Sequence, residues 1–471
     1  MTFNFSRILL LFFAIALLGS CGGRKTKTPP PEIVTPNGTK IYNPKTGRYE
    51  FPVEATGKVD TVAWTDASPS ANDPIQSDPS EYIKDEPTTT TSSGSGVFGT
   101  YNVAIMIPFN AHKVNTLEGG VHSSSLSALG FYEGAKIALE KLSEEGVNMN
   151  VTVMDTKRSE REVATLLNRS EVQNAHLIIG PYGSNSLKKV AAFAKEKKHP
   201  LISPVNTSSK ITTQNPFYIQ ANPSLKSHCE AILQHALRHH AASQIVLVCR
   251  NKPAEVKRLK YFQDANKVYA GSDSTPPLKE YIIDATLALE FGELDLKSYI
   301  QKGGETVFIV PSYSNETFIS NFMRELDLAK GREKVVVYGM PRWMEFERIS
   351  YDYYEQLNLH VSTANFVDKD NVKIQNFTRY FYEKYGALPT VNAFKGYDMT
   401  LYFGRQLQKY GTDFINKSDS EFEQELTTGF ELIKNIAPED VAKERLDKVN
   451  FIENKYVNIL KFKDYRFQKA D

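Results

Sequence analysis

Residues 177–209 read LIIGPYGSNSLKKVAAFAKEKKHPLISPVNTSS, and this stretch decides the expected fold. Two short apolar runs, 177–179 and 201–203, are each followed by Gly or Pro and then by Ser, Asn and Thr, residues that cap helices. Between the runs, residues 187–198 place apolar side chains on one helical face and lysines on the other. The pattern therefore predicts two parallel strands joined by a crossover helix.

The two polar loops of this stretch are expected at the same edge of the sheet. Tyr182 and Ser184 lie in the first loop, and Asn206 and Thr207 lie in the second. Ligands of open α/β sheets bind at the carboxyl ends of the strands, where helix N-termini offer free N–H groups to anions. Two interpretations stay open, because these residues either bind a ligand or only cap the helices that follow.

The composition is that of a globular protein with unstructured parts. The 471 residues are 41% hydrophobic and 24% charged, which is enough for a large core and for two lobes. The 56 Lys and Arg residues against 55 Asp and Glu leave a net charge of +1. Because no global field attracts an acidic surface, we expect no nucleic-acid partner.

The first residues resemble a bacterial lipoprotein signal. Arg7 precedes an apolar run at 8–18 that is too short to span a bilayer, and the sequence LGSC follows at 18–21. The resemblance implies a signal peptide over 1–20, cleavage before Cys21, and a lipid on that cysteine. The expected protein is then periplasmic and lipid-anchored to the inner or outer membrane. The alternative is an ordinary secretory cleavage site with an incidental cysteine.

The segment 21–100 is predicted to be a flexible linker after the lipidated cysteine. It is rich in Pro, Thr, Ser and Asp, and its low apolar content cannot offset the entropy of ordering the chain. One interruption at 40–65 contains aromatic and β-branched residues. This interruption either docks as a short strand or binds a partner, and the sequence does not decide between the two.

Cys229 and Cys249 are the two remaining cysteines, on an expected helix at 225–239 and an expected strand at 245–249. A helix packs about 10 Å from a sheet, whereas a disulfide needs Cα atoms roughly 4.4–6.8 Å apart, so we expect two buried free thiols. His235 and His239 lie one turn apart and could pair on a metal, but we expect them to favour the helix C-terminus instead. We expect no metal and no cofactor.

The folded region is expected to open with a run of βαβα units. A buried strand over 101–109 ends at a proline, a loop rich in Gly, Ser and His follows at 110–127, and an amphipathic helix covers 129–144. A strand at 151–154 and a helix at 160–172 come next. Such alternation predicts an α/β fold with a doubly wound parallel sheet.

Several strings around this region carry a family resemblance. FYEGAKIALEKL (131–142), VTVMDT (151–156) and PLISPVNTSS (200–209) surround the loop GPYGS, and FTRYFYEKYG (377–386) with GYD (396–398) comes later. Their order and spacing resemble the type I periplasmic substrate-binding proteins of the leucine/isoleucine/valine-binding class. The chain is also similar to the penicillin-binding protein activator lipoproteins.

The resemblance implies two Rossmann-like doubly wound lobes joined by a hinge. The expected parts are lobe 1 over 101–221, lobe 2 over 222–361, a return to lobe 1 over 362–445, and a C-terminal strand region over 446–471 that joins lobe 2. Crossings between the lobes are expected at 215–220 and 359–363.

The resemblance also implies where a ligand carboxylate would bind, in the loops after the third and fourth strands. Matched positions are Ser184, Asn206 and Thr207, although Asn206 departs from the small residue usual at its position. The second lobe offers Ser312 and Tyr313. The sequence does not place the acidic residue with which the family binds a ligand ammonium.

The expected function is therefore capture of a small polar ligand, such as an amino acid, a peptide or a cell-wall fragment. The resemblance implies ABC-type uptake or sensing, with an ABC permease as partner. The alternative is a protein-interaction lipoprotein that regulates a peptidoglycan synthase. No GxSxG, HExxH, P-loop or paired-carboxylate pattern supports catalysis, so we do not expect an enzyme.

Overall fold

The computed structural model describes residues 33–35, 38–43, 48–50, 96–114, 120–417, 423–441, 443, 445 and 448–470. The expected signal peptide, Cys21 and most of the expected linker lie outside these residues. Residues 1–89 and 90–471 form two separate units. In the first unit, β1 (Ile33–Thr35), β2 (Gly38–Asn43) and β3 (Arg48–Glu50) form an antiparallel sheet, so part of the interruption at 40–65 is strand.

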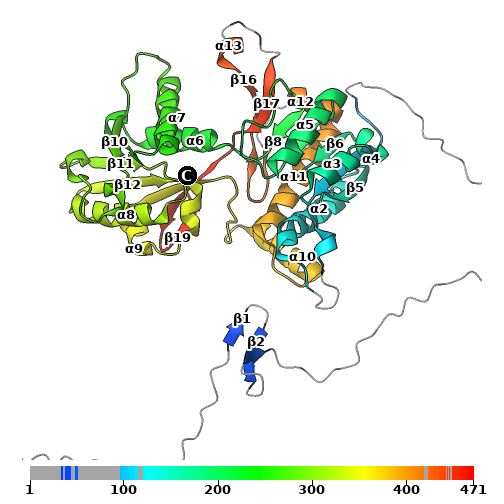
Figure 1. The fold of residues 1–471 in the computed structure, drawn as a ribbon, viewed down its shortest axis with the longest axis horizontal. Coiled ribbons are helices and arrows are strands. Elements are labelled where there is room, and N and C mark those ends of the chain that lie inside the picture. The colour runs from blue at the N-terminus through cyan, green and yellow to red at the C-terminus, as the bar shows by residue number, and fades with distance from the viewer. Residues whose placement is uncertain are drawn as a thin grey trace, which may run out of the picture. The chain divides into compact units, whose positions relative to one another are not determined.

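The second unit holds two lobes, each built on a seven-stranded sheet (Figure 1). The first sheet has the order β16-β17-β8-β7-β6-β4-β5. All neighbouring strands in it are parallel except β16, which is antiparallel to β17. Its strands are β4 (Tyr101–Ile107), β5 (Met149–Asp155), β6 (Leu177–Ile179), β7 (Leu201–Ser203), β8 (Tyr218–Gln220), β16 (Leu432–Ile436) and β17 (Val449–Asn454).

The second sheet has the order β10-β9-β11-β12-β13-β18-β19. Its first five strands are parallel, and β18 and β19 are antiparallel to their neighbours. The strands are β9 (Ile245–Arg250), β10 (Lys279–Ile283), β11 (Glu305–Ile309), β12 (Lys334–Gly339), β13 (Leu359–Thr363), β18 (Asn458–Lys463) and β19 (Arg466–Lys469). A separate pair, β14 (Glu423–Gln424) and β15 (Gly429–Phe430), is antiparallel.

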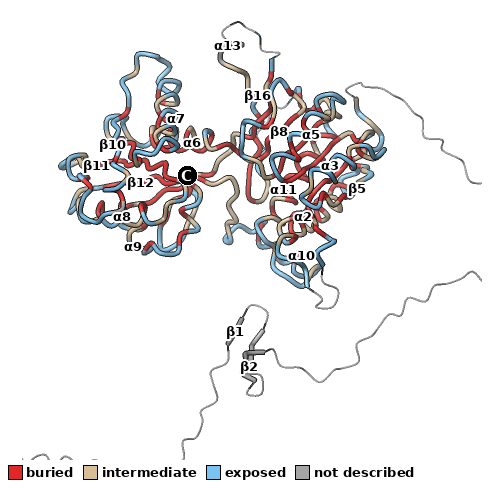
Figure 2. Tube along the Cα trace, in the orientation of Figure 1, coloured by how far each residue is buried: buried red, intermediate tan, exposed pale blue. Residues whose placement is uncertain are grey.

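Helices cover both faces of the first sheet. Along β4, Val103 and Ile105 pack in one cluster and Ala104 and Met106 in another, because alternate side chains of a strand point to opposite faces. Figure 2 shows the resulting band of buried residues along the strands. The helices of this lobe are α2 (Leu126–Glu144), α3 (Glu160–Leu166), α4 (Ser170–Gln173), α5 (Ser184–Lys197), α10 (Val372–Tyr385), α11 (Val391–Tyr410), α12 (Phe414–Lys417) and α13 (Pro438–Val441).

The second lobe has its own continuous core around β9, β11 and β12. Its helices are α6 (Leu225–His239), α7 (Pro253–Ala270), α8 (Glu316–Lys330) and α9 (Tyr351–Gln356). Cys229 on α6 and Cys249 on β9 are buried free thiols, as predicted. The prediction of two doubly wound α/β lobes is confirmed.

Close packing of α2 against α11 explains two of the family-like strings (Figure 1). A Cβ added to Gly134 would lie 1.8 Å from the carbonyl oxygen of Ala393, and one added to Gly396 would lie 1.8 Å from that of Phe131. Only glycine allows the two backbones to approach this closely. The glycines of FYEGAK and GYD are therefore required by packing.

The chain crosses between the lobes three times. The first crossing follows β8, the second follows β13, and the third joins β17 to β18. The expected crossing segment 215–220 contains β8, and the expected segment 359–363 is β13, so each ends where a crossing begins. The described part of the C-terminal strand region is divided between the lobes, because β17 pairs with β8 in the first sheet and β18 pairs with β13 in the second.

A buried carboxylate organises the second crossing. Asp398 on α11 is fully buried and accepts hydrogen bonds from the backbone N–H of Leu426 at 3.0 Å and of Thr427 at 2.9 Å. The Thr427 carbonyl in turn accepts from the N–H of Phe366 at 2.8 Å, within the crossing segment. Burial raises the pKa of Asp398 to about 7, although the hydrogen bonds from Thr427 oppose the shift.

We predict a specific pH dependence of stability from Asp398. Between pH 4 and about 7 the folded state keeps a proton on this group that the unfolded state has lost, so the free energy of unfolding falls as pH rises. The loss is at most on the order of 4 kcal/mol. Urea unfolding across this range should show that the wild type loses stability relative to Asp398→Asn as pH rises, because the amide of the variant does not titrate. Parallel curves would contradict the prediction.

Candidate functional site

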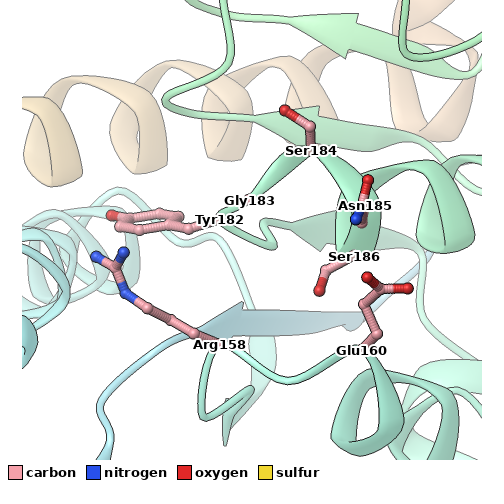
Figure 3. A pocket seen from close by; sticks show the side chains of 7 residues that line it. All are labelled: Arg158, Glu160, Tyr182, Gly183, Ser184, Asn185 and Ser186. Carbon is pink, nitrogen blue, oxygen red and sulfur yellow. The ribbon is translucent and has the colours of Figure 1, made fainter.

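The candidate site lies at the carboxyl ends of β5 and β6 in the first lobe. A pocket of about 460 Å³ is open there, between the turn after β5 and the start of α5 (Figure 3). It is lined by Arg158, Glu160, Tyr182, Gly183, Ser184, Asn185 and Ser186.

Gly180 and Gly183 shape the loop from β6 to the pocket. Both have positive φ values, 103° and 91°, which side-chain-bearing residues rarely adopt. A Cβ at Gly180 would lie 2.0 Å from the carbonyl oxygen of Met106 on β4. The loop can therefore leave the sheet next to β4 only because residue 180 is glycine.

Tyr182 stands in the loop with its ring against the first-lobe core. The residue is 7% exposed, its ring packs edge-on to that of Phe131, and burial raises the pKa of its phenol. The hydroxyl is buried beside Ser127 without a hydrogen bond of normal geometry. In Figure 3 this hydroxyl and the Arg158 guanidinium lie on the same side of the pocket.

The turn after β5 positions Arg158. Asp155 accepts hydrogen bonds from the N–H groups of Ala111 at 2.9 Å and of Lys157 at 2.8 Å. Partial burial acts to raise the pKa of Asp155, but these backbone hydrogen bonds hold it below its ordinary value. Lys157 and Arg158 then adopt left-handed φ values of 49° and 52°. Arg158 is exposed and forms no ion pair within the described part of the chain.

The start of α5 completes an electropositive surface. Its N-cap, Gly183, has no side chain to accept from the first N–H groups, and the first turn contains no acidic residue. Free N–H groups at a helix N-terminus carry partial positive charge and favour an anion. Glu160, on the opposite side of the pocket from Arg158, pairs with Lys189 at 3.5 Å. The pocket is therefore suited to a negatively charged group.

The structure separates the other candidates of the first lobe from this pocket. The Asn206 amide donates to the hydroxyl of Tyr218 at 3.1 Å and to Gln220 Oε1 at 3.3 Å, so the side chain faces its own lobe. Thr207 is exposed on the same loop after β7. Only Tyr182 and Ser184 of the four first-lobe candidates line the pocket.

The second-lobe candidates follow β11 and differ from each other in burial. Ser312 is fully buried, and its hydroxyl donates to Glu255 Oε1 at 3.1 Å while its carbonyl accepts from Trp343 Nε1 at 2.8 Å. Tyr313 is half-buried, and burial raises the pKa of its phenol. Tyr313 is thus the more accessible of the two side chains.

Arg158 was not among the site residues predicted from the sequence. The available signal was its position three residues after the end of β5, in the polar string DTKR at a strand carboxyl end. The left-handed turn that places its side chain beside Tyr182 depends on Asp155 and on the neighbouring loop at Ala111, which sequence periodicity does not predict.

Residues 132–437 match a family described as the receptor family ligand binding region. The chain belongs to this family. The family is defined by ligand binding, so the predictions of a type I binding-protein fold and of a non-enzymatic protein are confirmed. No curated protein matches the sequence.

Solved structures of this fold are similar at low sequence identity. A Rhodospirillum rubrum protein, named provisionally as a branched-chain amino acid ABC transporter, is 13% identical with a TM-score of 0.54, covering 78% of this chain and 99% of its own. A periplasmic ligand-binding protein of a branched-chain amino acid ABC transporter from Burkholderia xenovorans is 11% identical with a TM-score of 0.51, covering 79% and 94%. These likenesses establish the fold alone.

Two features are absent from the described residues. None of their helices is long and apolar enough to cross a membrane. They also contain no group of three or more His, Cys, Asp or Glu side chains arranged to hold a metal ion.

Proposed function

We propose that this member of the receptor family ligand binding region is a substrate-binding lipoprotein that captures a small polar ligand between its two lobes. The observation that carries the proposal is the pocket where Tyr182, Ser184 and Arg158 surround the uncapped start of α5. We assign the more accessible Thr207 and Tyr313 to the same ligand surface as contacts. Asn206 and Ser312, whose side chains are hydrogen-bonded within their own lobes, are assigned to it as supports of the loops that form it.

ABC-type uptake or sensing is the proposed role, with an ABC permease as partner. The Rhodospirillum and Burkholderia proteins are both named for branched-chain amino acid ABC transport, and the shared fold supports extending that class of role to this chain. The two-lobe architecture is suited to it, because closure on a ligand changes the surface that a permease would contact.

The alternative proposal is a protein-interaction lipoprotein that regulates a peptidoglycan synthase. It is favoured by Asn206, whose side chain is held against Tyr218 and Gln220 rather than in the pocket. Capture of a permease or of a peptidoglycan synthase from solubilised envelopes distinguishes the two proposals.

A ligand screen tests the main proposal. Amino acids, short peptides and cell-wall fragments are scanned by thermal shift, because a ligand that binds only the native state stabilises it by RT ln(1 + [L]/Kd). We expect at least one class to raise the melting temperature. Absence of stabilisation by every class would count against a solute-binding function.

Ser184→Glu should abolish this stabilisation, because a carboxylate at the start of α5 competes with the ligand for the free N–H groups. Ser170→Glu is the matched control, since Ser170 is also the exposed first residue of a helix but lies outside the pocket. Equal ligand stabilisation of the two variants would exclude the pocket as the binding site.

We further propose that Cys21 carries the lipid anchor in the periplasm. The described residues contain no helix that could span a bilayer, and a net charge of +1 gives no general attraction to anionic lipid. Cys21→Ala should move the protein from the membrane to the soluble fraction or change its processing, whereas Cys229→Ala should stay with the membrane. Retention of Cys21→Ala after a high-salt wash would overturn this assignment.

A further inference from the structure

The loops that follow β6 and β11 repeat one sequence pattern in the two lobes. Residues 178–185 read IIGPYGSN and residues 308–315 read FIVPSYSN. In each, a buried strand ends near a proline, and a tyrosine precedes the Ser-Asn pair beside the start of a helix, α5 or α8. Each lobe thus presents a tyrosine near the carboxyl edge of its sheet, Tyr182 directly after the proline and Tyr313 one position further along.

Each tyrosine lies within the electrostatic reach of an arginine. The positive charge of Arg158 acts on Tyr182. The positive charges of Arg342 and Arg258 act on Tyr313, where the negative charge of Glu345 opposes them. Arg258, on α7, is half-buried and donates from Nη1 to the carbonyl oxygen of Pro311 at 2.7 Å. Arg342 is paired with Glu345 at 3.3 Å.

Arg158 and Arg258 have no carboxylate partner among the residues that the structure describes. Arg258 uses one of its five N–H groups on Pro311, which leaves a guanidinium able to bind an anion in a fork.

The acidic groups near these arginines are already engaged. Asp155 is held by backbone N–H groups, and Glu160 pairs with Lys189. Glu255 is buried, forms an ion pair with Arg250 and accepts from the Ser312 hydroxyl. Within the described ranges, these loops therefore offer arginines for anions but no uncommitted carboxylate for a ligand ammonium.

The starts of α5 and α8 differ in their ability to bind an anion. The start of α5 is uncapped, so its N–H groups can add to Arg158. The start of α8 is capped by Asn315, which accepts from the N–H of Phe318 at 2.7 Å, and Glu316 occupies its first turn. In the second lobe, Arg258 rather than the start of the helix supplies the attraction for an anion.

We propose that the ligand carries two anionic groups on a short spacer and no cationic group. Arg158 and the start of α5 bind one anionic group, and Arg258 binds the other when the lobes close. This inference rests on the proposed solute-binding function and specifies its ligand class. Dicarboxylates and phosphorylated carboxylic acids share the required chemistry, and the test includes one of each.

Isothermal titration of the full chain with a matched panel tests the inference. Glutarate and 3-phosphoglycerate supply two anionic groups, butyrate supplies one, and glutamate and leucine add an ammonium. We expect one of the dianions to bind most tightly. Arg158→Gln and Arg258→Gln should each weaken that binding roughly 10- to 100-fold, the contribution of a charged hydrogen bond. Arg258→Gln should not change the already weaker affinity for leucine, which has no second anionic group for Arg258 to bind.

Arg161→Gln is the control, because Arg161 is an exposed arginine on α3 outside the pocket. Arg258→Lys keeps the charge but not the fork, so it should retain part of the affinity if the variant protein is folded. Tighter binding of leucine or glutamate than of either dianion would overturn the inference and leave the proposed function standing. Dianion binding that survives both glutamine substitutions would also overturn it. No binding by any panel member would overturn the inference, whereas the proposed function would then be decided by the wider ligand screen.

Discussion

The carboxylate of Glu453 joins the two lobes through hydrogen bonds, and other polar contacts hold the remaining crossings. Glu453 lies on β17 in the first sheet, is 1% exposed, and accepts hydrogen bonds from the Ser224 N–H at 2.8 Å and the Ser227 hydroxyl at 2.6 Å. A carboxylate this deeply buried costs free energy unless it is hydrogen-bonded, and the start of a helix favours negative charge. The first helix of the second lobe is therefore fixed to the last parallel strand of the first.

The other crossings are also held by polar contacts. Asn454 donates to the carbonyl oxygens of Ala221 at 3.2 Å and Gly429 at 2.9 Å, which ties the third crossing to the first. Asp398 holds the loop that binds the second crossing. The apolar clusters, in contrast, each stay within one lobe. A hinge of a few hydrogen-bonded segments between two separate cores is suited to domain closure, because the cores need not repack.

Much of the fold could be predicted because local patterns agree with it. The apolar runs at 177–179 and 201–203 are strands, and the helix between them buries Leu187, Val190 and Ala191. Local patterns do not predict which sheet each C-terminal strand joins. β18 alternates in burial and β17 is buried along most of its length. They pair in different sheets, and that choice depends on the hydrogen bonds of Asn454 and Glu453 rather than on periodicity. The site was predictable only in part for the same reason. The loop with Tyr182 and Ser184 follows from strand and cap signals, whereas Arg158 depends on a left-handed turn, and the direction of Asn206 depends on partners in β8.

Hydrogen exchange of the native protein, with and without a stabilising ligand, examines most directly whether the start of α5 receives the ligand's anionic group. The backbone N–H groups of Ser184, Asn185 and Ser186 have no capping side chain, so they should exchange quickly in the free protein and slow markedly when ligand is bound. The first turn of α3, which Ser159 caps through the Glu162 N–H, should change little. Ligand-dependent protection confined to other segments, with unchanged exchange at residues 184–186, would contradict the assignment of this pocket as the binding site.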